Sequence, residues 1–357
     1  MSQAPTSPYD NPLSFASCSI GLPRHTLEQK LDAIAAAGFN GIELSFPDLR
    51  SFANRHLGRG DVAEDDYASL CEAGKLVRAL CDRKKLTIMV LQPFANFEGW
   101  PRASREREDA FARARGWVEI MAAVGTDMLQ VGSSDAPGIA SASLEDLAAD
   151  LAELADLLAA RGFRVAYENW CWATRAPSWR DVWDIVRLAD RPNLGLCLDT
   201  FQSAGGEFGD PTTASGRIEA AGEAAGELAE EELRSSYESS LRALTETVPS
   251  DKIYFLQISD AYKVQPPLGT EADAEGLRPR GRWSHDHRPL PYDGGYLPIV
   301  PFLEAVMATG FRGWLSVEVF DGKFEEKYGD DLEGYAVKCR EAVVKMLGDM
   351  TLDKSRY

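Results

Sequence analysis

Four short, β-prone stretches of this chain each end on a side chain that offers an oxygen ligand. These side chains are Glu168, Asp199, Gln257 and Glu318. Enough chain separates successive stretches for a crossover helix, so they are candidates for neighbouring parallel strands, about 4.8 Å apart, with their carboxyl ends on one rim. Any one of them could be an ordinary polar residue at a strand end, but four in succession favour a divalent-metal site.

The kind of ligand indicates the kind of ion. Three carboxylates and one amide oxygen suit hard cations such as Mg²⁺ or Mn²⁺, with Co²⁺ also acceptable, and they disfavour structural zinc. Four protein ligands leave open positions on an octahedral ion, which could bind a substrate ketone and hydroxyl and act as a Lewis acid. The sequence therefore predicts one catalytic divalent ion.

Alternation along the strands favours a closed barrel. Residues that share a face with the three carboxylates are small, namely Ala166, Cys197 and Ser316. Their neighbours of opposite parity are mostly Val and Leu, as in a parallel barrel packed inside a ring of helices. Phe255, on the face of Gln257, is the exception.

The order of elements predicts a single (β/α)₈ TIM barrel, with its chemistry at the carboxyl ends of the strands. The expected strands cover residues 14–19, 41–44, 87–92, 127–131, 165–168, 194–199, 253–258 and 314–318. The expected helices cover about 26–37, 65–84, 105–124, 143–161, 179–189, 298–309 and 331–347.

The connections between these elements are uneven. A polar loop containing His56 is expected after the second strand, and Pro93 is expected to end the third. A Pro- and Gly-rich loop follows residue 258, and an insertion at about 202–250 begins Gly-rich and turns helical and acidic. Residues 1–13 read as a disordered leader before one domain at 14–357.

Composition excludes several classes of protein. The chain has 357 residues, 45% of them hydrophobic, enough for one large core, and its net charge of −18 argues against nucleic-acid partners. Neither a membrane-length apolar run nor a secretory signal, P-loop or dinucleotide-binding glycine motif is found. Six scattered cysteines read as reduced thiols. We therefore expect a cytoplasmic protein without membrane partners.

Several motifs resemble a known family. The four ligand candidates, in this order, resemble those of the sugar isomerase, epimerase and dehydratase superfamily with the xylose-isomerase-like barrel. More narrowly, the chain resembles the 3-dehydroshikimate dehydratases, particularly the fungal quinate-pathway enzymes, from about residue 15 to 347. The motifs are Leu-Gln-Pro-Phe at 91–94 with Phe-Glu-Gly at 97–99, Ala-Tyr-Glu at 166–168 with Cys-Trp at 171–172, residues 190–199, and Trp-Ser at 283–284 with Arg288.

The resemblance implies loss of water from 3-dehydroshikimate to give protocatechuate. The metal would hold the 3-keto and 4-hydroxyl oxygens, a base would take the proton next to the ketone, and the 5-hydroxyl would leave as the ring aromatises. Arg288 is the candidate for the substrate carboxylate, since a guanidinium can bind it in bidentate fashion. Further candidates for substrate binding are Ser284, Gln92, Phe94, Trp172, Arg175 and Trp283, although tryptophans also pack in cores.

Proton transfer has three candidates. His285 and His287 alternate on a loop beside the rim, where they are either proton-transfer groups or surface residues. Glu43 ends the second strand at the same rim, as a carboxylate behind the ligands or a partner for an arginine such as Arg175. His285 and Ala95 stand where relatives often carry basic residues, so a modified or less acidic substrate stays open.

Other functions are compatible with parts of this sequence pattern. An isomerase, epimerase or inosose-type dehydratase of the same superfamily, acting on another keto-polyol, would share the metal ligands. A multi-metal DNA-repair endonuclease would need more than four histidines and a cationic face. A non-catalytic binding protein would not need the ligand set. The long loops after residues 199 and 258 could close the site over a small-molecule substrate or form a homodimer contact.

Overall fold

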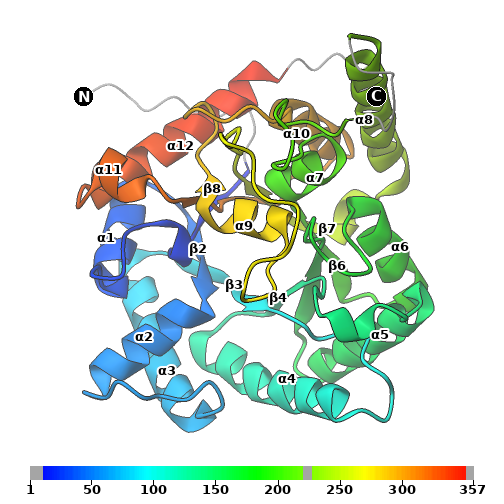
Figure 1. Cartoon of the computed structure of the whole chain (residues 1–357). Helices are drawn as coiled ribbons and strands as arrows, with labels where there is room; N and C mark the ends of the chain where they lie inside the picture. Colours follow the sequence, from blue (N-terminus) through cyan, green and yellow to red (C-terminus); the bar gives the residue numbers. More distant parts are fainter. Residues whose placement is uncertain (1–10, 220–226, 351–357) are drawn as a thin grey trace.

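A computed structural model describes residues 11–219 and 227–350 of the chain. Eight parallel strands form a closed barrel, which confirms the predicted TIM barrel (Figure 1). In order around the barrel they are β1 (Leu13–Ala16), β2 (Gly41–Ser45), β3 (Thr87–Phe94), β4 (Met128–Gly132), β5 (Arg164–Glu168), β6 (Leu194–Asp199), β7 (Ile253–Ile258) and β9 (Trp314–Val317). Most of the predicted leader, residues 220–226 of the predicted acidic insertion, and residues 351–357 lie outside the described residues.

Helices surround the barrel (Figure 1). They are α1 (Leu27–Ala36), α2 (Phe46–His56), α3 (Tyr67–Lys84), α4 (Arg105–Val124), α5 (Leu144–Ala159), α6 (Trp179–Ala189), α7 (Thr200–Glu207), α8 (Glu227–Thr247), α9 (Pro279–Asp286), α10 (Ile299–Ala308), α11 (Phe324–Tyr328) and α12 (Leu332–Asp349). Ser143 and Ser178 begin α5 and α6 with capping boxes, which satisfy backbone N–H groups of the first turn. Within the described ranges, none of these helices has the length and apolarity needed to cross a bilayer.

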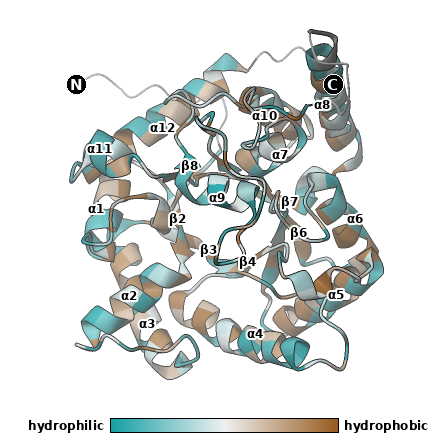
Figure 2. Ribbon diagram, viewed as in Figure 1, coloured by the Kyte–Doolittle hydropathy of each residue, from teal (hydrophilic) through white to brown (hydrophobic). Residues whose placement is uncertain are grey.

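The core has two parts. Inside the barrel lies a small cluster of Met89, Val90, Met128, Ala166, Cys197 and Phe255. A much larger cluster fills the space between the strands and the outer helices, which carry both hydrophobic and hydrophilic residues along their length (Figure 2). Ala166 and Cys197 therefore point toward the barrel axis, as their parity predicted.

Two connections differ from the expectation. The prediction of a polar loop directly after the second strand is wrong, because residues 46–56 form α2. Its buried Phe46, Leu49, Phe52 and Ala53 make an apolar stripe that the charged residues between them obscured. The third strand also continues through Pro93 to Phe94, at a point where the pairing between β3 and β4 is irregular. A missing backbone N–H costs little there.

The Pro- and Gly-rich loop after β7 contains more structure than predicted. It includes α9 and the two-residue strand β8 (His287–Arg288), which pairs antiparallel with β10 (Phe320–Asp321). In Figure 1, α9 lies in front of the centre of the barrel. Arg278 donates to the carbonyl of Trp172 at 2.6 Å, and Arg280 donates to that of Gly205 at 3.2 Å. These bonds attach α9 to the loops at the carboxyl ends of the strands.

Candidate metal centre and active site

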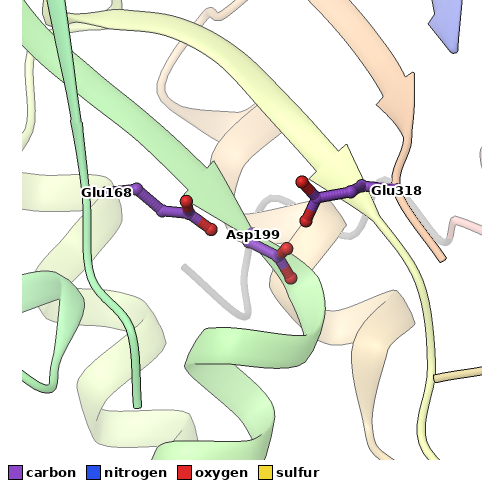
Figure 3. A group of neighbouring side chains, drawn as sticks. All are labelled: Glu168, Asp199 and Glu318. Atoms are coloured by element: carbon purple, nitrogen blue, oxygen red, sulfur yellow. The ribbon is translucent and has the colours of Figure 1, made fainter. Parts of the chain in front are cut away.

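Three carboxylates meet at the carboxyl end of the barrel. Glu168 ends β5, Asp199 ends β6, and Glu318 directly follows β9. One ligand atom from each lies within 4.8 Å of the others, and all three side chains are buried. Figure 3 shows them pointing toward one another. The barrel thus brings together residues that are up to 150 positions apart in sequence, because β5, β6, β7 and β9 are consecutive neighbours in the sheet.

The carboxylates are held by fixed donors. Gln130 and Trp170 both donate to Oε2 of Glu168, the indole N–H at 3.0 Å. Oε1 of Glu168 is buried without a hydrogen-bond partner among the described residues. Asp199 Oδ1 accepts the backbone N–H groups of Phe201 and Gln202 at the start of α7. A buried carboxylate oxygen without a hydrogen-bond partner fits a residue that binds a cation through that oxygen.

Arg288 lies among these carboxylates. Its Nη2 donates to Asp199 Oδ2 at 2.5 Å and lies 3.1 Å from Glu318 Oε2, while its Nε and Nη2 donate to Ser259 Oγ at 3.1 and 2.8 Å. The side chain is 1% exposed. Arg288 was expected to bind a substrate carboxylate. Its guanidinium is instead committed to protein acidic groups and to a serine behind them.

The electrostatics of the site favour a bound cation. Burial raises the pKa of Glu168, and the charges of Glu318 and Asp199 raise it further. Burial raises the pKa of Asp199, against the lowering effect of Arg288, and it raises the pKa of Glu318 to about 7. Three carboxylates face one guanidinium, so a divalent ion would compensate charge that Arg288 alone cannot. The all-oxygen donor set fits Mg²⁺ or Mn²⁺.

The predicted fourth ligand, Gln257, lies on β7 between β6 and β9 and is fully buried. Its amide N–H donates to Glu43 Oε2 at 2.8 Å, and its amide oxygen accepts the Cys197 thiol at 3.3 Å. Gln92 donates to Glu318 Oε1 at 3.4 Å. Gln92 and Glu43 thus lie directly behind the ligand candidates.

An aromatic wall, made of Trp170, Trp172 and His285, lies beside Glu168. The rings of Trp170 and Trp172 stack with centroids 5.1 Å apart, and the His285 ring meets Trp172 edge-on at 5.8 Å. The Trp172 indole donates to Asp135 Oδ2 at 3.1 Å. Burial lowers the pKa of His285, and the charge of Arg288 lowers it further. His285 is therefore neutral near pH 7 and able to accept a proton.

His287 and Ser284 have different surroundings. His287 and Arg288 are consecutive residues of β8, so they face opposite sides, and Arg288 faces the carboxylates. His287 pairs in register with Asp321. Ser284 Oγ accepts from Arg288 Nη1 at 3.3 Å. Of the two histidines, the structure brings only His285 beside the aromatic wall.

Two predicted substrate-binding residues, Trp283 and Phe94, pack elsewhere, and a third, Arg175, lies on a loop at the carboxyl end of the barrel. Trp283 is a fully buried residue of α9, where it packs against Phe201. Phe94 is also fully buried and faces α4, with the Trp117 ring 4.9 Å away. Arg175, on the loop after β5, has a buried Nε without a hydrogen-bond partner among the described residues. The two aromatic residues support the scaffold, and Arg175 stays a candidate for substrate binding.

Two residues that hydrogen-bond to side chains of the site were not predicted from the sequence. Gln130 is a lone polar residue on the inward face of an otherwise apolar β4, and that pattern could have identified it. Ser259 lies two positions after Gln257 and so shares its face, but it binds Arg288, whose position no local pattern predicts.

Comparisons with known proteins agree with this geometry. The family described as xylose isomerase-like TIM barrel matches residues 31–337. Three curated relatives share the name 3-dehydroshikimate dehydratase. That of Neurospora crassa is 31% identical over 95% of this chain and 94% of its own length. That of Pseudomonas aeruginosa is 33% identical over 84% of this chain, but the match spans 37% of the relative. A solved xylose isomerase-like TIM barrel/4-hydroxyphenylpyruvate dioxygenase fusion protein gives a TM-score of 0.68 at 27% identity, over 94% of this chain and 42% of that chain.

Proposed function

The chain belongs to the xylose isomerase-like TIM barrel family, and we propose that it dehydrates 3-dehydroshikimate, the substrate in the name of its curated relatives, and that the product is protocatechuate. The observation that carries the proposal is the buried triad of Glu168, Asp199 and Glu318 at the carboxyl rim. The Neurospora crassa relative matches nearly full length, which favours this substrate over another keto-polyol. The six free cysteines fit a cytoplasmic location.

The three carboxylates of the triad, with Gln257, would hold one Mg²⁺ or Mn²⁺, and Co²⁺ is a further candidate. When bound, the ion supplies Lewis-acid polarisation of a substrate ketone. Gln92 and Arg288 fix the position of Glu318 by donating to it, and Arg288 also holds Asp199. The protein therefore arranges the donor oxygens before substrate arrives.

The aromatic wall and His285 are assigned the remaining roles. Trp172 offers a flat apolar surface to the substrate ring. Neutral His285 accepts the proton next to the ketone, the 5-hydroxyl leaves with a proton as water, and a final proton shift makes the ring aromatic. Arg175, whose Nε has no hydrogen-bond partner among the described residues, is the candidate for binding the substrate carboxylate.

The test uses metal-free protein, 3-dehydroshikimate, and Mg²⁺, Mn²⁺ or Co²⁺ added separately. We expect the ultraviolet absorbance of a catechol acid to rise with at least one ion and to stay flat without any. Glu318→Gln should lower kcat by at least about 100-fold with an unchanged melting profile, because it removes a charged donor from the triad. Flat traces with every ion would reject the substrate, and full activity of the variant would remove Glu318 from the site.

A further inference from the structure

Glu43 is a fully buried acid inside the barrel. It lies on β2, paired in register with Ala16 and Val90, and its side chain is 0% exposed. Among the described residues no lysine, arginine or histidine forms an ion pair with it. Its Oε2 accepts a hydrogen bond from the amide of Gln257 on the other side of the barrel. A buried acid without a basic partner in the described part of the chain requires an explanation.

The bond to Glu43 fixes which way the Gln257 amide faces. An amide has a donor end and an acceptor end. The Nε2 of Gln257 faces Glu43 and donates to its Oε2 at 2.8 Å. The opposite end, Oε1, then faces β6, where the Cys197 thiol donates to it at 3.3 Å. Cys197 pairs in register with Glu168, and Gln257 pairs with Asp199, so this is the side of the triad.

We propose that Glu43 is a positioning residue, which accepts a hydrogen bond from Gln257 and so presents the amide oxygen to the cation held by the triad. The inference rests on the metal site of the proposed function. With the opposite orientation an N–H₂ group would face a divalent ion, and Gln257 would repel the ion instead of binding it. Glu43 touches no substrate in this role, which differs from the catalytic role that its place at the rim suggested.

Two variants of Glu43 separate orientation from charge. Glu43→Gln replaces the carboxyl group with an amide and lets either end of residue 43 face Gln257. Glu43→Asp keeps the charge, but its carboxylate is one methylene shorter and withdraws from Nε2. We expect both to weaken Mn²⁺ binding by about 10-fold, the lower end for residues that orient metal ligands. The measurement is calorimetric titration of metal-free protein with Mn²⁺ alone, and thermal melting of each variant checks its fold.

A double-mutant cycle provides the control. In a Gln257→Leu background there is no amide to orient, so neither Glu43 variant should weaken Mn²⁺ binding further. If Glu43 acts only through its charge, Glu43→Asp binds like wild type and Glu43→Gln still weakens binding in the Gln257→Leu background. That pattern, or unchanged affinity in both variants, overturns the inference while leaving the metal site intact. A wild-type protein that binds no Mn²⁺ refutes the metal site, and the inference with it.

Discussion

Replacing Arg288 with Met should destabilise the metal-free protein strongly and the metal-loaded protein much less. In the described part of the chain, Arg288 is the basic side chain that pairs with Asp199 and with Glu318, and it is 1% exposed. Methionine fills a similar volume without charge. The variant therefore leaves three carboxylates facing one another in a buried site, with burial already raising the pKa of each.

The size of the effect follows from the burial of the pair. Removing one partner of a buried ion pair costs about 3–5 kcal/mol, because the other charge is left without compensation. A chain of this length loses about 2 °C of melting temperature per kcal/mol, so the metal-free variant should melt about 6–10 °C below wild type. Saturating Mn²⁺ supplies two positive charges to the same oxygens. It should therefore raise the melting temperature of the variant by more than it raises that of wild type.

The assay is thermal melting of both proteins with a chelator and with Mn²⁺. Arg280→Met is the matched control, since Arg280 lies on α9, which directly precedes β8 and Arg288, but donates to the backbone carbonyls of Gly205 and Gly209. Arg280→Met should lower the melting temperature by less than Arg288→Met does, and by the same amount with and without Mn²⁺. If Arg288→Met lowers the melting temperature equally under both conditions, or leaves that of the metal-free protein unchanged, the charge balance derived for this site is wrong.

Two further predictions concern the scaffold. Burial raises the pKa of Glu98 from 4.5 to about 7, so its contribution to stability is complete below pH 4.5 and is lost as pH rises through 7. Wild type should lose about 3 kcal/mol relative to Glu98→Gln between pH 4.5 and 8 in urea denaturation, and a gap independent of pH would contradict this. Phe94→Leu should cost about 1 kcal/mol of stability and leave KM unchanged, because Phe94 packs against Trp117 and not the site; a raised KM would return Phe94 to substrate binding.

Local patterns in the sequence were sufficient to predict the barrel and the rim at which three of its carboxylates meet. Strand parity put Ala166 and Cys197 inside the barrel, and the order of strands put Glu168, Asp199 and Glu318 at one rim, as the structure has them. These features depend on the two-residue period of a strand and on the neighbour relations of parallel strands. Both are properties of short segments, so one sequence is enough to see them.

Only the tertiary structure determined which partner each polar group has. Arg288 was recognisable as an important cation, but its commitment to Asp199 depends on α9 crossing the barrel mouth. Glu43 and Gln257 are 214 residues apart and meet because the barrel closes around them. Such contacts are set by the packing of whole elements, and no spacing along the chain records them. The sequence therefore determined which strand ends carry the carboxylates, and the fold determined which side chains hydrogen-bond to them.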